Sequence, residues 1–195
     1  HENGIGSYKW SPNGRWIAFT SKDDESAEIK KKKKDGYDMI VMGEKQLYNR
    51  LWIYDVENKS YETIFRQDLN VSLFEWSEDS KFIVFQAAEK VNTDIEYLES
   101  SIYIVKSPSG NPRKIAETPG KLSSMSLSPN TEKLAYLGAT SYNDPLAQSI
   151  YVHQIKNGKS KLITPGFKES FVDVEWIDDQ TVIGLSQRGT KTVLS

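Results

Sequence analysis

The two histidines of the chain, His1 and His153, are the first residues to test for chemistry, because a serine nucleophile needs an imidazole held by a carboxylate. His1 is the terminal residue and is interpreted as a tag or cloning remnant. His153 shares a predicted strand column with Tyr54 and Val105, which favours packing over catalysis. The Gly-x-Ser-x-Gly pattern of a nucleophile elbow is absent, as is cysteine. We therefore assign no catalytic residue.

Clustered carboxylates are the next candidates for chemistry. They occur at 22–26 (KDDES) and 177–179 (IDD), both on predicted turns. Calcium requires six to eight oxygen ligands at set spacing, and neither cluster has a recognised loop pattern. Both clusters are interpreted as solvated turns, so no metal ligand and no cofactor-binding residue is assigned.

A run of five lysines at 30–34 is the most basic stretch of the chain. It has acidic neighbours and no interleaved aromatic residues, so it is interpreted as a solvated loop rather than a nuclear or nucleic-acid signal. The net charge of −2 gives no general attraction to nucleic acid or to an anionic membrane. Apolar runs are only a few residues long, which argues against a membrane span. The compartment stays open: cytoplasm is preferred over periplasm or secretion.

The elements that would position such residues are repeated. Four segments align without gaps, at 8–21, 74–87, 125–138 and 174–187, and each reads as strand, turn and strand. Their shared columns predict burial of five aromatic residues: Trp10, Phe19, Trp76, Phe85 and Trp176. Lys9 lies on the polar face of its strand, where replacement by alanine should be nearly neutral.

A third and a fourth strand follow in the first three units. "LWIYD" (51–55), "IYIVK" (102–106) and "IYVHQ" (150–154) form one column, and weaker segments after hairpin-like turns form the other. Four-stranded units of about 40 to 50 residues predict an all-β fold, a β-propeller of antiparallel blades. The blades are expected at about 6–67, 71–117, 122–165 and 171–195, in one domain spanning 1–195. A β-sandwich with accidental similarity is the alternative.

The sequence resembles a known family at these repeats. "SPNGRWIAFTS" and "SPNTEKLAYLG" resemble the propeller repeat of TolB-like proteins and of the prolyl oligopeptidase family of serine peptidases. The Lys-rich insertion leading into 35–56, followed by 118–155 and 162–176, is similar to acylaminoacyl-peptidase-like members. Glu78 and the IDDQ of the fourth unit depart from the repeat.

This resemblance implies a non-catalytic propeller that gates peptide access to an α/β-hydrolase domain, which this chain does not carry. The parent protein would be a serine peptidase, and its partners would be a peptide substrate and that hydrolase domain, with no nucleic acid and no membrane. Dipeptidyl-peptidase relatives use two adjacent glutamates, whereas two residues separate Glu96 from Glu99, so that role is not transferred and a solvated loop is favoured. The alternative is a stand-alone TolB-like propeller that binds proteins. The insertion and the stretch at 143–149 favour the peptidase.

The repeat count predicts an incomplete ring of about three and a half blades. The last blade is expected to lack its third and fourth strands after the segment at 181–195. We therefore expect a part of a longer protein whose bare end faces self-associate. The alternative is a closed four-bladed ring in which residues 1–7 complete the last blade.

Overall fold

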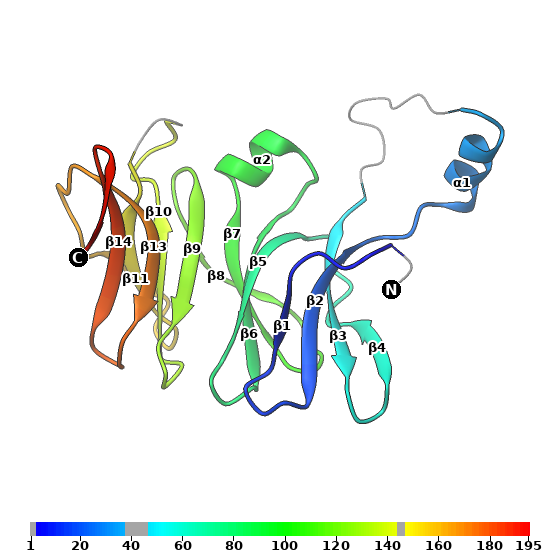
Figure 1. Cartoon of the computed structure of the whole chain (residues 1–195), viewed down its shortest axis with the longest axis horizontal. Helices are drawn as coiled ribbons and strands as arrows, with labels where there is room; N and C mark the ends of the chain where they lie inside the picture. Colours follow the sequence, from blue (N-terminus) through cyan, green and yellow to red (C-terminus); the bar gives the residue numbers. More distant parts are fainter. Residues whose placement is uncertain (1–2, 38–46, 144–146) are drawn as a thin grey trace.

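The computed structural model describes residues 3–37, 47–143 and 147–195 as four antiparallel sheets in a row (Figure 1). The first sheet contains β1 (Tyr8–Trp10), β2 (Trp16–Lys22), β3 (Asn49–Asp55) and β4 (Ser60–Thr63). The second contains β5 (Asn70–Trp76), β6 (Phe82–Ala88), β7 (Ser101–Lys106) and β8 (Arg113–Glu117). The third contains β9 (Leu122–Leu127), β10 (Lys133–Gly138), β11 (Ser149–Gln154) and β12 (Lys159–Leu162). The fourth contains β13 (Ser170–Trp176), β14 (Val182–Arg188) and β15 (Lys191–Leu194).

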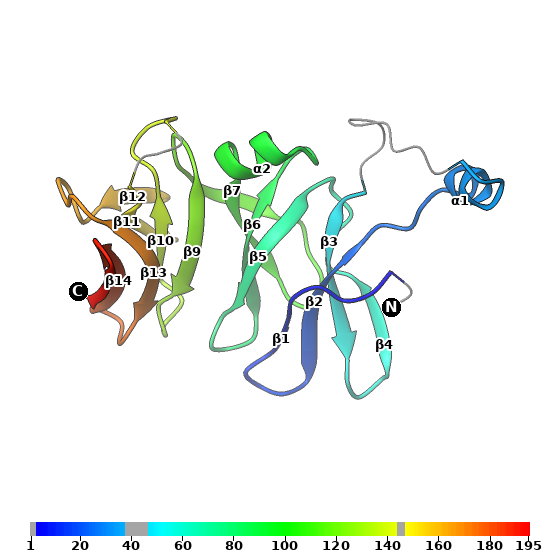
Figure 2. The same cartoon turned by 45° about the horizontal axis from the view of Figure 1, so that its top comes forward.

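The sheets form an open arc, which confirms the predicted partial propeller. Strand order within every sheet follows chain order, so each sheet is a meander. Figures 1 and 2 place the first and fourth sheets at opposite ends of the molecule, and no sheet closes on itself. Residues 4–7 run along β2, where Gly6 N donates to Thr20 O at 2.8 Å. The alternative of a four-bladed ring completed by residues 1–7 is therefore wrong, because the described part of this segment lies along the first sheet.

The repeated Ser-x-Asn or Ser-x-Asp turn has a defined hydrogen-bond pattern. In the first sheet, Ser11 Oγ accepts from Trp16 N at 2.9 Å, and Asn13 Oδ1 accepts from Arg15 N at 3.0 Å. The second and third sheets repeat both bonds around Ser77 and Ser128. These short side chains satisfy backbone donors that the tight reversal leaves unpaired, which explains why the motif recurs.

The fourth sheet departs from the repeat by one residue. Trp10 pairs with Ile17 and Trp76 with Ile83, whereas Trp176 pairs with Val182. The turn is shorter because Asp178 Oδ1 accepts from both Gln180 N and Thr181 N, at 2.7 Å each. The ungapped alignment is therefore wrong in the second half of its fourth segment, and a one-residue slip moves Ile183 to the other face of the sheet.

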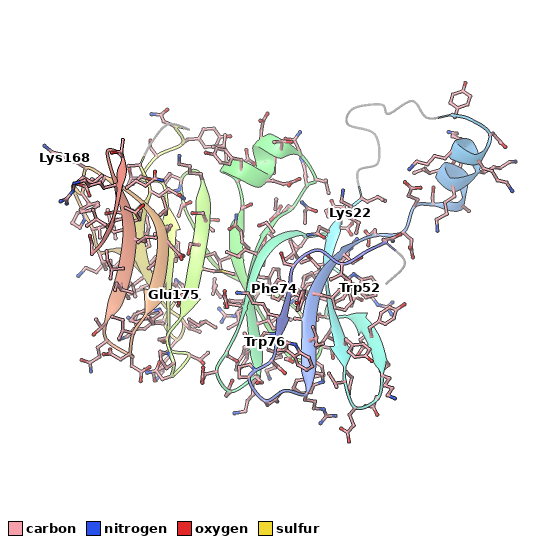
Figure 3. All side chains as sticks on the ribbon, viewed as in Figure 1. Lys22, Trp52, Phe74, Trp76, Lys168 and Glu175 are labelled. Atoms are coloured by element: carbon pink, nitrogen blue, oxygen red, sulfur yellow. The ribbon has the colours of Figure 1, made fainter. Side chains whose placement is uncertain are left out.

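The core consists of three apolar layers, one between each pair of neighbouring sheets. Phe74 and Trp76 lie between the first and second sheets (Figure 3). Tyr136 lies in the layer between the second and third sheets, and Phe171 in the layer between the third and fourth. The second and third sheets are therefore covered on both faces by their neighbours. The first and fourth sheets each have one face that no other described sheet covers.

The predicted burial of the repeated aromatics holds for three of the five residues. Phe19, Trp76 and Phe85 are buried, and Trp176 is half-buried. Trp10 was predicted buried and is wrong, since 53% of its surface is exposed. The reason is its position on the uncovered face of the first sheet, where no described strand packs against it.

Three expectations about individual segments also need correction. The last sheet does have a third strand, β15, because the segment at 181–195 contains two strands rather than the one expected. The lysine run at 30–34 belongs to a helix, α1 (Ala27–Lys34), and the acidic loop at 92–100 contains α2 (Thr93–Leu98). Neither helix in the described part of the chain is long and apolar enough to cross a membrane.

Candidate functional site

The connections between the second and third strands form one face of the arc, here called the loop face. In the first three sheets these connections span 23–48, 89–100 and 139–148, and their described parts lie along the same side in Figures 1 and 2. In a meander sheet the connection between the second and third strands lies at one end of the strands. The short turns between the first and second strands and between the third and fourth lie at the other end. The expected insertion of the first blade, between 21 and 48, is confirmed here. Parts of this insertion, and Asp144 to Leu146 of the segment at 143–149, lie outside the described residues.

Helix α1 carries the lysine run of the insertion into solvent. Ser26 caps its first turn by accepting from Ile29 N at 3.3 Å, and no residue of the helix is buried. Lys32 pairs with Glu28 at 3.0 Å, and Lys33 pairs with Glu25. The interpretation as a solvated segment is supported, although the segment is helical. The lysines of its last turn stabilise the helix, because their positive charges lie at the negative, carbonyl end of the helix dipole.

Tyrosines link and decorate the loop face. Tyr48 Oη donates to the backbone oxygen of Glu89 at 3.1 Å, and Tyr142 Oη donates to Glu99 Oε1 at 3.2 Å. These bonds connect the first loop to the second and the third to the second. Tyr37, Tyr97 and Tyr142 are 67%, 47% and 57% exposed. Sequence reasoning missed this group, because the alignment of strands gives no information on loops of different length.

Arg50 anchors the insertion to the body of the first sheet. Its Nε lies 2.9 Å from Asp23 Oδ1, its Nη2 lies 2.7 Å from Asp68 Oδ1, and its Nη1 donates to Gln67 O at 2.6 Å. The hydrogen bond that Arg50 donates to Asp23 raises the pKa of Arg50, against the effect of burial. The guanidinium fork therefore holds the strand that ends the insertion against the loop after β4.

A row of polar residues, here called the inner row, lies on the first strands of the sheets. Lys9 pairs with Glu75, Ser126 Oγ donates to Glu175 Oε2 at 2.9 Å, and Ser124 Oγ donates to Asp173 Oδ1 at 2.5 Å. Burial raises the pKa of Glu75, Lys9 opposes the shift, and the charges of Glu175 and Asp173 add to it. Replacement of Lys9 by alanine would remove the counter-ion of Glu75, a contact that the alternation of the strand did not indicate.

His153 is fully buried in β11, opposite Leu134 and Ser160. Its Nδ1 lies 2.9 Å from Ser160 Oγ, and its Nε2 has no hydrogen-bond partner in the described structure. Burial lowers the pKa of His153, and the charge of Arg113 acts in the same direction. A neutral, packed imidazole is the physical result, in agreement with the packing role assigned from the sequence.

The two carboxylate clusters are engaged within the fold. Asp23 binds Arg50, and Asn3 Nδ2 donates to Asp24 Oδ1 at 2.7 Å. Asp178 closes its own turn, and Asp179 Oδ1 accepts from Asn130 N of the third sheet at 2.8 Å. Across residues 3–37, 47–143 and 147–195, no group of three His, Cys, Asp or Glu is placed to hold a metal ion.

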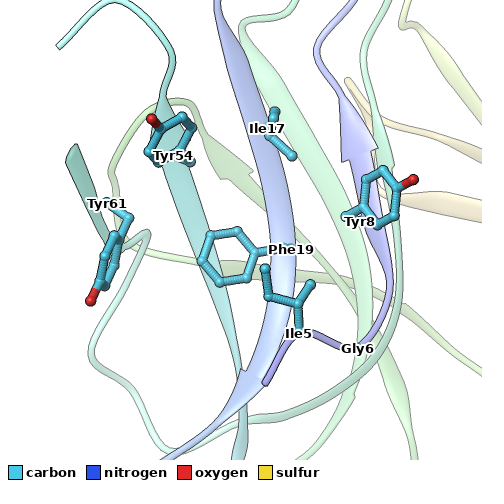
Figure 4. Close-up of a pocket in the computed structure, with 7 residues that line it drawn as sticks. All are labelled: Ile5, Gly6, Tyr8, Ile17, Phe19, Tyr54 and Tyr61. Atoms are coloured by element: carbon cyan, nitrogen blue, oxygen red, sulfur yellow. The ribbon is translucent and has the colours of Figure 1, made fainter. Parts of the chain in front are cut away.

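An apolar hollow marks the uncovered face of the first sheet. Its volume is about 570 Å³, and its lining includes Ile5, Tyr8, Ile17, Phe19 and Tyr54. Figure 4 shows the aromatic rings of β1, β2 and β3 spread along this face, with Ile5 next to Phe19. The corresponding face of the second sheet is covered by the first sheet, so the hollow corresponds to the place that the preceding sheet occupies at the internal boundaries.

These repeated sheets define a β-propeller segment. Solved structures with the same fold include a TolB-type protein from Agrobacterium tumefaciens, with 16% identity, a TM-score of 0.66 and coverage of 100% of this chain and 58% of the other. Another is a prolyl endopeptidase studied for the role of inter-domain dynamics in catalysis and specificity. It is 14% identical, with a TM-score of 0.64 and coverage of 98% of this chain and 26% of its own. No family model and no curated protein matches the chain.

Proposed function

We propose that the chain is the non-catalytic propeller segment of a prolyl-oligopeptidase-family serine peptidase, and that it gates peptide access to a hydrolase domain outside this chain. The proposal is supported by the fold shared with the prolyl endopeptidase, of which this segment spans 26%. The resemblance of the Lys-rich insertion to acylaminoacyl-peptidase-like members supports the same choice.

The observation that carries the proposal is the loop face. Connecting loops held by a rigid scaffold are where binding residues concentrate. Here the longest connections gather at one edge, are tied together by Tyr48 and Tyr142, and present three exposed tyrosines. Tyrosine combines an apolar ring with a hydroxyl, which suits contact with peptide backbone and side chains. The loop face is therefore the surface we assign to peptide entry.

A stand-alone binding module is the second candidate. The TolB-type structure matches the whole of this chain at a TM-score of 0.66, so the fold alone supports it equally. In that case the loop face would contact a partner protein, and no hydrolase would be attached.

Recovery of the native polypeptide separates the two candidates. Antibodies against this chain would isolate the natural protein from cell extract, and a fluorophosphonate probe would then report an active-site serine. The proposal predicts a labelled polypeptide much larger than 22.2 kDa, with the labelled serine in a Gly-x-Ser-x-Gly sequence outside this chain. An unlabelled polypeptide built only of further repeats would support the binding module instead.

Gating itself is tested in that labelled parent protein. Tyr97→Ala with Tyr142→Ala should change the ratio of kcat/KM between long and short peptides, because both side chains lie on the entry surface. Ile177→Ala is the matched control, since Ile177 is 62% exposed on the opposite, short-turn edge. If the double tyrosine variant and Ile177→Ala changed kcat/KM to the same extent for long and short peptides, the loop face would not act as a gate.

A further inference from the structure

The three internal sheet boundaries share one arrangement of apolar side chains. At each boundary, the face of the later sheet is rich in aromatic residues and the face of the earlier sheet is mostly aliphatic, with Trp16 at the first boundary and Phe82 at the second as its aromatic members. Phe74, Trp76 and Phe85 meet Ala18, Leu51 and Ile53 at the first boundary. Tyr136 and Tyr151 meet Val84, Ile102 and Ile104 at the second, and Phe171 and Trp176 meet Ala135, Leu137 and Ile150 at the third.

Two boundaries also share a polar arrangement on the inner row. Trp76 Nε1 donates to the backbone oxygen of Lys9 at 3.2 Å, and Trp176 Nε1 donates to the backbone oxygen of Ser126 at 2.9 Å. The side chains of the same two acceptor residues bind a glutamate of the later sheet: Lys9 binds Glu75, and Ser126 binds Glu175. Each boundary of this kind thus fixes its register by an indole-to-carbonyl bond beside a polar pair.

Each end of the arc carries one of the two kinds of face that meet at an internal boundary. The uncovered face of the first sheet, here called the head face, is aromatic: Tyr8, Trp10 and Tyr61 are 64%, 53% and 51% exposed. The uncovered face of the fourth sheet, here called the tail face, is aliphatic. It contains Ile183, Leu185 and Leu194, which the strand register places opposite the face that packs on the third sheet.

We propose that the head face of one copy of this chain binds the tail face of a second copy, in the same geometry as the internal boundaries. Glu175 occupies in the fourth sheet the position that Lys9 and Ser126 occupy as acceptors. In the complex its backbone oxygen accepts from Trp10 Nε1 of the other copy, and its carboxylate faces the ammonium group of Lys9 there. The charges at the contact are opposite, as they are between Lys9 and Glu75.

This contact is heterologous, so it produces a ring if the rotation closes and a filament if it does not. Two copies supply twice the four sheets of one chain, which lies at the upper end of the four to eight blades that propellers contain. A closed pair in which each head face binds the other tail face is therefore the assembly we infer. The inference concerns this chain by itself, because in the longer protein of the proposed function further blades would cover the same two end faces.

The first measurement is the mass of the chain in a dilution series, by sedimentation velocity. We expect a species of twice 22.2 kDa that dissociates on dilution. Two single variants then address one face each: Tyr8→Lys on the head face and Leu194→Lys on the tail face. Both side chains are 64% exposed, so the fold should tolerate the change. Each variant alone should raise the dissociation constant at least about tenfold, since a lysine ammonium would be desolvated in the contact.

Mixing the two variants is the decisive step. The Tyr8→Lys chain keeps its tail face and the Leu194→Lys chain keeps its head face, so the mixture should recover a dimer through one intact contact. Recovery also shows that both variants are folded. Tyr142→Lys, at a residue 57% exposed on the loop face, is the matched control and should associate like the parent chain.

Chemical cross-linking locates the contact. Because the chain has no cysteine, Lys9→Cys and Glu175→Cys introduce single thiols in two separate preparations. A short bismaleimide should link the two chains in a mixture but neither chain to itself. A parent chain that stays monomeric at all concentrations would overturn the proposal. So would a Leu194→Lys variant that still dimerises alone, which would indicate head-to-head contact.

Discussion

Trp76 Nε1 lies 3.2 Å from the backbone oxygen of Lys9 and donates a hydrogen bond to it across the first sheet boundary. The same indole stacks on Trp16 at a centroid distance of 6.4 Å, so one side chain joins the inner row to the apolar layer behind it. Fifty residues apart in sequence, Trp176 and Ser126 repeat the hydrogen bond. The boundary between blades, rather than the single sheet, is therefore the repeated unit of structure.

Trp76→Ala should destabilise the chain by about 3 to 5 kcal/mol, the usual cost of truncating a buried large aromatic side chain. The matched comparison is Trp10→Ala, because Trp10 occupies in the first sheet the position that Trp76 occupies in the second and is 53% exposed. Its cost should stay under about 1 kcal/mol, as for most surface changes. Urea unfolding of both variants, at concentrations where the chain is monomeric, measures the difference. Equal losses of stability in Trp76→Ala and Trp10→Ala would mean that packing of a neighbouring sheet does not determine the contribution of this tryptophan.

Glu75→Gln should change how stability depends on pH. Burial raises the folded-state pKa of Glu75 above 4.5, so the wild-type chain binds more protons folded than unfolded in this range. That contribution is complete below pH 4.5 and is lost as pH rises through the folded pKa. The free energy of unfolding of Glu75→Gln, measured relative to wild type, should therefore increase from about pH 4 upward and then level off. A difference that stays constant with pH would contradict the assigned burial.

Arg50→Ala should cost about 2 kcal/mol, because the guanidinium makes charge-assisted hydrogen bonds to Asp23 at the start of the insertion and to Asp68 in the loop after β4. Arg50→Lys should recover less than half of the loss, since an ammonium cannot bind Asp23 and Asp68 in the same fork. Arg15→Ala is the control: Arg15 is more exposed, lies 3.7 Å from Asp55, and should change stability by less than about 1 kcal/mol. Thermal unfolding of the three variants ranks them, and an Arg50→Lys variant as stable as the parent would exclude the fork.

Gly184→Ala tests the shifted register of the fourth sheet. A Cβ at this position would lie 2.6 Å from Phe171 Cε1 and 2.7 Å from Ile150 Cδ1. Overpacking of this kind typically costs about 1 to 3 kcal/mol. Gly158→Asn is the control, because its φ of 69° is one that asparagine tolerates and no atom lies within 4 Å of the added Cβ. In the ungapped register Gly184 would face away from the third sheet, and the alanine would then be harmless.

The sequence repeat was sufficient to predict the strands and the partners of most columns, because alternation and turn chemistry are local. Trp76 and Phe85 lie in the predicted layer for this reason. The exposure of Trp10 could not be predicted from its own segment, since burial depends on a neighbouring sheet. The one-residue slip at Trp176 arises from the shorter Asp178 turn, which the letters IDDQ do not distinguish from a four-residue match.

The loop face was the least predictable part of the candidate site. Helix α1 contains a continuous lysine run and helix α2 has six residues, so neither has an apolar period to identify it. The contacts of Tyr48 with Glu89 and of Tyr142 with Glu99 join segments about 40 residues apart. Such contacts follow from the stacking of the sheets and are not encoded in any single loop.

We predict that this propeller segment performs no hydrolysis of its own, and incubation of the purified chain with a fluorophosphonate probe is the direct test. The sharpest challenge is Ser160, whose Oγ lies 2.9 Å from the buried His153 Nδ1. We predict no labelled serine after incubation at pH 8, beside a serine hydrolase that labels fully under the same conditions. Covalent labelling of Ser160 that is lost in His153→Ala would show instead that the segment carries a reactive serine of its own.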